Sequence, residues 1–347
     1  MYRKKLLLGI ALVGLMVCGF FAYKIYAAIF SPNTSFNNDE AIVFIPTNGT
    51  MDTVVERLSP LLKNTAAFTA VAERKGYASN VKGGRYIIKK GMNNNEIINS
   101  LRSANQPVRV SFNNQETLAD LAGRIATQIE ADSVTLLKAF NEPAFLDENG
   151  FDEDTKLAMY LPNTYEFFWN TSAVEFRQRM LQEYKRFWNE ERLKKAADQN
   201  LDPQEVSALA AIVQKETVKI DERPRVAGVY LNRLKISMPL QADPTVIFAI
   251  RKETGVYDTV IKRVLYRDLE IDSPYNTYKN NGLPPGPITM PDISSIEAVL
   301  NPEKHNYLYF VVDVSNFGYH KFAATGEQHN QNKVQYIRWL NSKKIRR

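Results

Sequence analysis

The stretch EVSALAAIVQKET, residues 205–217, decides how the C-terminal half of this sequence is interpreted. Val206, Leu209 and Val213 recur at the spacing of one helix face, which predicts a buried stripe. The next position on that stripe is Glu216. Because a carboxylate is almost never fully buried without a partner, Glu216 either pairs inside the protein or lines a cleft.

A strong start signal precedes this stretch. Asp202 is placed as an N-cap, Pro203 lies in the first turn, and Glu205 is the acid of a capping box. The sequence therefore predicts a helix that runs to about Thr217.

Two interpretations of Glu216 follow from its position. A carboxyl group packed among apolar side chains has a raised pKa, which is what a general acid needs at neutral pH. The alternative is a helix-end glutamate paired with Arg223 or Arg225. The residue pattern alone favours the pairing.

Composition places the whole chain among globular proteins. It has 347 residues, 44% hydrophobic and 24% charged, enough for two or three domains with cores. The net charge is +6, but Arg3, Lys4, Lys5 and Lys24 supply four of those charges at the N-terminus. The remaining residues carry no nucleic-acid signature.

The N-terminus predicts a membrane anchor. MYRKK is followed by LLLGIALVGLMVCGFFAY, residues 6–23, which carries no charge. As a helix this run is roughly 27 Å long, close to the hydrocarbon thickness of a bilayer. Positive charges before the run favour a cytoplasmic N-terminus. We expect a cytoplasmic tail at 1–5, an uncleaved anchor at 6–30 and the remainder outside the inner (plasma) membrane.

Two other kinds of N-terminal signal fit this sequence less well. A cleaved signal peptide has a shorter apolar core and an A-x-A-like site, which is absent from this sequence. A lipoprotein signal would use Cys18, but Val17 is bulky and the apolar run continues beyond the cysteine. Since Cys18 is the only cysteine, the external portion has no disulfide and no cysteine metal site.

Three strand-turn-helix units follow the anchor. Residues 31–40 are polar and turn-rich, and predict a linker. The units begin near Ala41, Arg85 and Val108 and suggest a compact module. The residues leave its role open between a structural stem and a carbohydrate-binding module.

The segments after residue 217 combine apolar helices with polar turns. RPRVAGVYLNRLKI places Tyr230 and Arg233 on one helix face, with Asn232 beside it. Gln241 and Asp243 cluster in the next turn.

A long irregular loop is predicted at residues 273–291, which are dense in proline and glycine. Tyr275, Asn276, Thr277 and Tyr278 in this loop suit a saccharide-binding wall, and the alternative is a connector.

The C-terminal segment predicts a hairpin around Asn316 and Gly318. His305, His320 and His329 have no metal-ligand spacing, and nucleotide-binding motifs are absent from the sequence. No metal and no cofactor are therefore expected.

Six motifs carry a family resemblance. They occur in the order AAIVQKET, VAGVYLNRL, PLQADPTVIFAI, SPYNTY, GLPPGPI and YLYFVVD…GYHKF, within about 120 residues. Together they resemble the membrane-bound endolytic peptidoglycan transglycosylases of the MltG/YceG-like family, from about Ile42 to the C-terminus. The resemblance reverses the preference for a paired Glu216.

The resemblance implies a fold and a catalytic residue. The family's acid is the second glutamate of a motif like I-V-E-K-E-T, which is Glu216 here, while Gln214 occupies the first position. It also implies a small LysM-like α/β module at 41–107 and a mixed α+β catalytic domain at 108–347. The expected fold class is α+β with a single N-terminal transmembrane helix.

The implied reaction cleaves the MurNAc–GlcNAc β-1,4 bond of nascent glycan strands without water. Glu216 would protonate the glycosidic oxygen and then accept the proton of the MurNAc 6-hydroxyl, which gives a 1,6-anhydro end. A hydrolase would need a second carboxylate about 5–5.5 Å or about 6.5–9.5 Å away, for which Asp221, Glu222 and Asp243 are candidates. We expect Asp243 to orient Gln241 or the substrate.

The implied partners are peptidoglycan strands, the membrane and peptidoglycan synthases, and not nucleic acid. A non-catalytic, membrane-anchored scaffold of the wall-synthesis machinery is the alternative function. The expected substrate-binding residues are Asn232, Gln241, Asp243, Tyr275, Asn276, Thr277, Tyr278 and His320.

Overall fold

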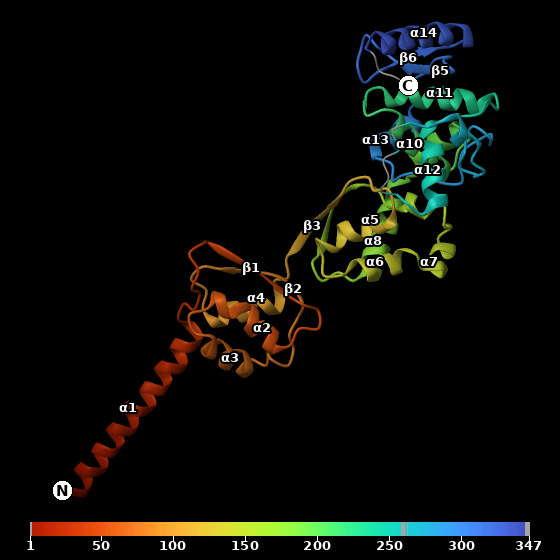
Figure 1. The fold of residues 1–347 in the computed structure, drawn as a ribbon. Coiled ribbons are helices and arrows are strands. Elements are labelled where there is room, and N and C mark those ends of the chain that lie inside the picture. Colours follow the sequence, from red (N-terminus) through yellow and green to blue (C-terminus); the bar gives the residue numbers. More distant parts are fainter. Residues whose placement is uncertain (1, 258–260, 262, 344–347) are drawn as a thin grey trace. The chain divides into compact units, whose positions relative to one another are not determined.

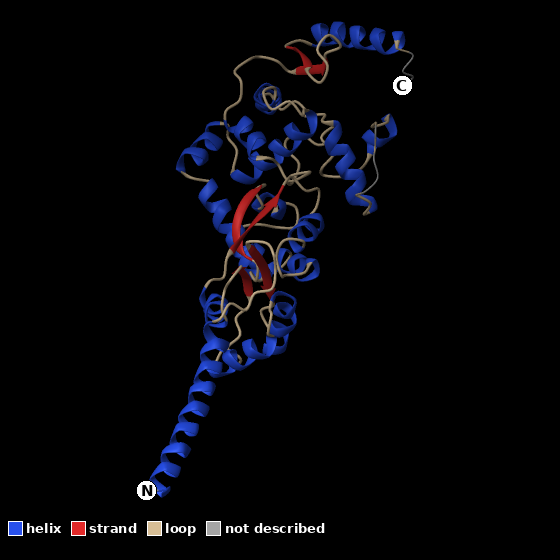
Figure 2. Cartoon of the chain, turned by 90° about the vertical axis from the view of Figure 1, so that its left-hand side faces the viewer, coloured by secondary structure: helices blue, strands red, loops and turns tan. Residues whose placement is uncertain are grey.

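The structure is a computed structural model that describes residues 2–257, 261 and 263–343 (Figure 1). Two compact units make up the chain. The first contains residues 1–110, Ala126–Ala131 and Tyr165–Ser172, and the second contains the remainder. Helices form most of the regular secondary structure, and the strands occur as short pairs (Figure 2). The α+β class predicted from the sequence is confirmed.

The elements alternate along the chain. The helices are α1 (Tyr2–Phe30), α2 (Met51–Leu58), α3 (Thr65–Arg74), α4 (Asn94–Ser103), α5 (Leu118–Ala126), α6 (Ser133–Phe140), α7 (Pro143–Glu148), α8 (Ala173–Phe187), α9 (Glu190–Asp198), α10 (Pro203–Glu216), α11 (Arg223–Lys235), α12 (Asp243–Thr254), α13 (Ile293–Leu300) and α14 (Gly326–Ser342). The strands are β1 (Glu40–Ile45), β2 (Gly84–Lys89), β3 (Pro107–Phe112), β4 (Asn163–Phe168), β5 (Tyr309–Val312) and β6 (His320–Ala323). Short 3-10 helices lie at Ser59–Leu61, Lys156–Met159 and Tyr266–Glu270.

The N-terminal helix α1 has the length and composition of a membrane span. In the part of the chain that the structure describes, it is the one helix long and apolar enough to cross a bilayer. Its side chains are exposed along the apolar run. These properties fit a single-pass membrane anchor.

The first unit is built around the antiparallel pair β1–β2. The pairing runs from Glu40 opposite Lys89 to Ile45 opposite Gly84. Because side chains alternate along a strand, one face of the pair is buried against a core that α2, α3 and α4 also line. Each strand precedes a helix, β1–α2, β2–α4 and β3–α5, as the three sequence units predict.

Residues 31–40, which their polar composition predicts to be a linker, make contacts inside the first unit. Asn33 and Thr34 are buried, and Asn33 Nδ2 donates to Asn94 Oδ1 at 2.7 Å. Isolated backbone bridges join Pro32 to Asn93 and Thr34 to Leu62. The polar residues satisfy one another inside the unit, which composition cannot distinguish from a solvated turn.

Helix α10 forms the centre of the second unit. It is buried from Val206 to Gln214 and packs against α9, α11, α12 and α13 (Figure 1). Its predicted capping box is present, since Asp202 Oδ1 accepts from Glu205 N at 2.8 Å and Glu205 Oε2 accepts from Asp202 N at 2.9 Å. The helix ends at Glu216, within one residue of its predicted end.

The predicted C-terminal hairpin is also present. Strands β5 and β6 pair antiparallel from Tyr309 opposite Ala323 to Val312 opposite His320, and α14 packs against both strands. Gly318 in the connecting turn has a φ of 87°, a conformation that glycine adopts without steric cost. The hairpin places His320 at the first position of β6.

Candidate active site

The carboxyl group of Glu216 accepts a hydrogen bond from a buried tyrosine. Glu216 is the last residue of α10 and is partly buried. Its Oε1 lies 2.7 Å from Tyr230 Oη of α11. The two arginines considered as ion-pair partners are engaged elsewhere, Arg223 with Asp292 and Arg225 with Glu303. The structure therefore does not support the ion-paired interpretation of Glu216.

Burial raises the pKa of Glu216 to about 7. The Tyr230 hydrogen bond opposes this rise because it stabilises the carboxylate. The charges of His320 and Arg233 also lower the pKa, whereas that of Asp243 raises it. Near neutral pH this carboxyl group is therefore present in both protonation states, as a group that gives and regains a proton requires.

A second carboxylate, Glu222, holds His320 in place. Its Oε1 accepts from the His320 backbone N–H at 2.6 Å, and its Oε2 lies 2.9 Å from His320 Nδ1. Burial acts to raise the pKa of Glu222, but hydrogen bonds from His320 and Thr217 outweigh it and keep the pKa below its ordinary value. Both oxygens of this buried carboxylate are thus bonded within the protein.

The third acid, Asp243, is bonded to Tyr278. Asp243 begins α12, and its Oδ1 accepts from Tyr278 Oη at 2.5 Å. Burial, and then the bond to Asp243, raise the pKa of Tyr278, so the phenol is a neutral donor at pH 7. The negative charge of Asp243 also raises the pKa of Glu216.

Arg233 brings a buried positive charge close to the carboxyl group of Glu216. Its Nε donates to Leu308 O and its NH1 nitrogen to Leu240 O, both at 2.6 Å. Burial lowers the pKa of Arg233, but a guanidinium stays charged in proteins. Arg233 thus fixes the backbone before α12 and before β5 while favouring the ionised form of Glu216.

Five of the residues expected to bind substrate retain exposed surface. Gln241 and Asp243 are exposed, and Asn232, Tyr278 and His320 are partly exposed. Gln241 has a φ of 49°, and its backbone N–H donates to Thr277 O at 3.1 Å. These positions stay candidates for contact with a ligand.

The expected saccharide wall is largely buried. Tyr275 Oη donates to Asp154 Oδ1 at 3.0 Å, Asn276 Nδ2 donates to Leu269 O at 2.8 Å, and the side chains of Tyr275, Asn276 and Thr277 are almost fully buried. These three side chains therefore do not present the open wall that was expected. An irregular loop has many backbone groups to satisfy, and the side chains of Asn276 and Thr277 serve that purpose.

Thr277 and Asn232 have similar structural roles. The Thr277 hydroxyl accepts from Ala242 N at 3.0 Å and supports the turn before Asp243. Asn232 Nδ2 donates to His305 O at 2.9 Å and to Tyr307 O at 3.1 Å, which commits its amide nitrogen to the backbone before β5.

Gln214 joins α10 to the start of α13. Its Nε2 donates to Met290 O at 3.2 Å, and its Oε1 accepts from Asp292 N at 2.5 Å and from Ser295 Oγ at 3.3 Å. Two residues along a helix correspond to a rotation of about 200°, so Gln214 and Glu216 lie on opposite sides of α10. The buried amide is therefore a packing element.

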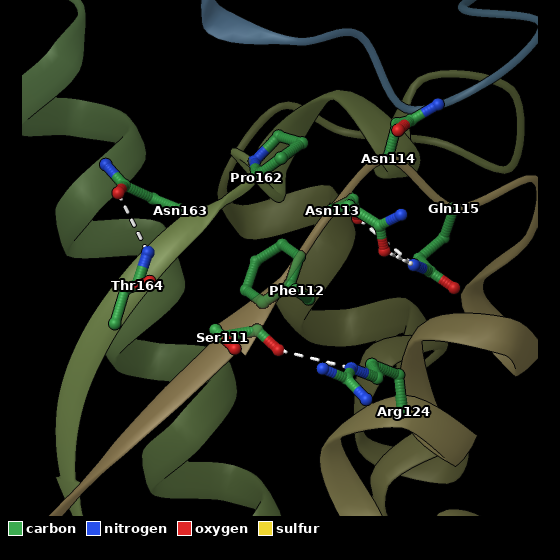
Figure 3. Close-up of a pocket in the computed structure, with 9 residues that line it drawn as sticks. All are labelled: Ser111, Phe112, Asn113, Asn114, Gln115, Arg124, Pro162, Asn163 and Thr164. Carbon is green, nitrogen blue, oxygen red and sulfur yellow. Dashed lines mark hydrogen bonds between the residues drawn. The ribbon is translucent and has the colours of Figure 1, made fainter.

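An open hollow lined by amides lies elsewhere in the same unit (Figure 3). It has a volume of about 870 Å³, and its lining residues include Asn113, Asn114, Gln115, Asn163 and Thr164. Gln115 O accepts from Met290 N at 3.0 Å, so the loop after β3 contacts the segment that Gln214 binds. Amides and hydroxyls of this kind suit a neutral polar ligand.

Comparison with known proteins identifies the family. The model of the YceG-like family matches residues 43–335. The chain belongs to the YceG-like family. A relative from Bacillus subtilis (strain 168), named endolytic murein transglycosylase, is 30% identical, and the alignment covers 95% of this chain and 93% of the relative.

Further relatives support the assignment to the YceG-like family. A protein of the same name from Streptococcus pneumoniae serotype 2 is 28% identical over 92% of this chain and 62% of its own length. The crystal structure of a putative YceG-like protein from Listeria monocytogenes has 28% identity and a TM-score of 0.55, covering 85% of this chain and 99% of that one.

The sequence of this YceG-like chain placed Tyr230 and Arg233 on one helix face and gave Glu222 as a candidate second carboxylate, but it did not predict their contacts in the site. Tyr230 and Arg233 are three residues apart on the apolar face of α11. A polar side chain on an apolar helix face is the same signal that marked Glu216. Glu222 gave no such signal, because it lies in a turn and its contact with His320 spans 98 residues. In the described residues, no group of three or more His, Cys, Asp or Glu side chains could hold a metal ion.

Proposed function

We propose that this chain is an endolytic murein transglycosylase whose general acid and base is Glu216. The observation that carries the proposal is the partly buried carboxyl group of Glu216, with a pKa raised to about 7, at the end of α10. The name of the Bacillus subtilis relative, which aligns over nearly the whole of both chains, supports the same activity.

The first step breaks the glycosidic bond between C1 of MurNAc and O4 of GlcNAc. Protonated Glu216 donates its proton to that oxygen, so the departing GlcNAc leaves as an alcohol. Positive charge develops at the anomeric carbon as the bond breaks. The newly formed carboxylate is stabilised by the Tyr230 hydrogen bond and by the charge of Arg233.

The second step closes a ring within the MurNAc residue. The Glu216 carboxylate accepts the proton of the 6-hydroxyl, and O6 forms the new bond to C1. The product is a 1,6-anhydro end, Glu216 is protonated again, and no water is consumed. One carboxyl group is sufficient because the proton that it gives is replaced by the proton that it receives.

The nearby acids are less suited to a hydrolase. Hydrolysis needs a second carboxylate to act on water or on the sugar. Glu222 is bonded to His320 through both oxygens, and Asp243 accepts from Tyr278. This arrangement favours the water-free reaction, with Asp243 and Gln241 orienting the substrate beside Glu216.

The N-terminal helix α1 supports a proposal for the location of the enzyme. We propose that α1 holds the chain in the plasma membrane with its N-terminus in the cytoplasm and both units outside. The first unit then acts as a LysM-like, glycan-binding module, and peptidoglycan synthases supply the nascent strands. The amide-lined hollow offers further groups for the same polymer.

The products distinguish this function from its alternatives. Purified peptidoglycan incubated with the full chain in detergent should yield fragments with 1,6-anhydroMurNAc ends in mass spectrometry. Fragments with reducing MurNAc ends would instead indicate a hydrolase. Unchanged glycan after long incubation would favour the non-catalytic scaffold.

A further inference from the structure

A groove lies where the anchor helix α1 meets the rest of the first unit. It has a volume of about 420 Å³ and runs between the outer end of α1 and α3. Its apolar lining includes Phe21, Ile25 and Ile29 from α1 and Val71 from α3. Apolar side chains in such a groove can cover a hydrocarbon chain.

The polar part of the groove is basic. Lys24, Arg74 and Lys75 line it, and its lining contains no carboxylate. Lys75 Nζ binds amide oxygens, that of Asn95 at 2.5 Å and that of Asn99 at 2.7 Å. Its ammonium group is therefore held in place without an anion.

A further cation, Arg102, contacts Lys75. Arg102 donates to the Lys75 carbonyl oxygen, and burial together with the Arg102 charge lowers the pKa of Lys75. In the described part of the chain, neither side chain makes an ion pair, and the neighbouring acid on α3, Glu73, lies outside the groove lining. Positive charges gathered in this way favour an anionic ligand.

In the proposed membrane topology, on which this inference rests, the groove lies at the height of the lipid headgroups. Residues 6–23 form an uncharged run of roughly 27 Å, which fills the hydrocarbon layer, so Lys24 lies at its outer boundary. The end of α1 is attached to the rest of the unit, because Asn94 Nδ2 donates to Ala28 O at 2.7 Å. Asn94 is itself held in place, since its Oδ1 accepts from Asn33 Nδ2. The basic and apolar halves of the groove therefore meet the corresponding halves of a phospholipid.

We propose that this groove binds an anionic phospholipid of the outer leaflet. The acyl chain packs against Phe21 and Ile25, and the phosphate lies among Lys24, Arg74 and Lys75. Each basic residue near an anionic membrane surface adds to the electrostatic attraction. The bound lipid would hold the first unit against the membrane, and this role is independent of the proposed glycan chemistry.

Photocrosslinking of the full chain in nanodiscs tests the proposal. Nanodiscs of phosphatidylcholine would contain a trace of a probe with a diazirine in its acyl chain, either phosphatidylglycerol or phosphatidylcholine. We expect the phosphatidylglycerol probe to label peptides from the outer end of α1 and from α3 roughly tenfold more than the other probe. Equal labelling by the two probes would overturn the proposal.

Two variants test whether the preference for phosphatidylglycerol depends on the basic residues of the groove. Combined Lys24→Gln, Arg74→Gln and Lys75→Gln substitutions should remove the preference for phosphatidylglycerol. Lys24→Gln alone, at an exposed position of α1, should reduce it without affecting the fold of the unit. An unchanged preference in both variants would contradict the assignment to this groove.

A matched control uses basic residues of the same unit outside the groove. Arg57, Lys63 and Lys82 are suitable because they do not line it. Combined substitution of these three residues by glutamine should retain the preference. An equal loss in this control would show general charge attraction and refute a specific site. Glycan cleavage does not enter the readout, so failure of the proposed enzymatic activity would leave this test intact.

Discussion

The hydroxyl group of Tyr230 lies 2.7 Å from Oε1 of Glu216 and joins the end of α10 to the middle of α11. Burial raises the pKa of Tyr230 well above its ordinary value, so the phenol stays protonated and acts as the donor. This hydrogen bond fixes one oxygen of the carboxyl group. It also stabilises the carboxylate that must form after the first proton transfer.

Replacing Tyr230 tests the hydrogen bond. Because the bond lowers the pKa of Glu216, Tyr230→Phe should raise that pKa further. The alkaline limb of the kcat/KM profile should move up by about one pH unit, since a hydrogen bond to a charged group contributes about 1.5–3 kcal/mol. We expect kcat to fall about tenfold through loss of orientation. A limb that stays in place or moves down would exclude this role.

Asp243→Asn should shift the same limb in the opposite direction. The negative charge of Asp243 raises the pKa of Glu216, so a neutral side chain lowers it. The alkaline limb should then move to lower pH by a few tenths of a unit. Asp221→Asn is the control, because Asp221 is exposed and bonded to Tyr319. The interpretation fails if both variants shift the limb equally.

Gln214→Leu should affect stability rather than catalysis. The substitution leaves Met290 O and the Asp292 backbone N–H without their buried partner. The free energy of unfolding should fall by about 1–3 kcal/mol, which denaturant titration measures. The pH profile of kcat/KM should be unchanged, because Gln214 lies on the opposite side of α10 from Glu216. A changed profile would place Gln214 in the catalytic machinery.

The raised pKa of Glu216 also predicts a pH dependence of stability. The folded state holds this proton up to a pH of about 7, whereas the unfolded chain releases it near pH 4.5. Folding thus takes up a proton in this range, and the contribution of Glu216 to stability decreases as pH rises through it. Between pH 4.5 and 8, wild type should lose roughly 1–3 kcal/mol relative to Glu216→Gln. A constant difference between the two proteins would show that the pKa is ordinary.

Local signals in the sequence were sufficient for the elements that carry the site. The capping box of Asp202 and Glu205 and the apolar stripe ending at Glu216 lie within one helix, so α10 could be predicted almost to the residue. The hairpin around Gly318 likewise depends on neighbouring residues. Such features follow from spacing and turn chemistry alone.

Contacts between distant residues could not be predicted in this way. Asn276 looked available for sugar binding, but it satisfies the carbonyl groups of Leu269 and Ile271. Asn33 looked like part of a linker, but its partner Asn94 is 61 residues away. A polar residue in a turn-rich segment has the same composition whether it faces water or a buried carbonyl group, and only the fold distinguishes the two.

The most direct test of the central claim is the activity of Glu216→Gln, which keeps the shape of the side chain but cannot give or accept the proton. With purified peptidoglycan, mass spectrometry should find no release of 1,6-anhydroMurNAc fragments above background. Circular dichroism and thermal unfolding should confirm that the variant is folded. Anhydro-ended fragments released at the wild-type rate by this variant would contradict the assignment of Glu216 as the acid and base.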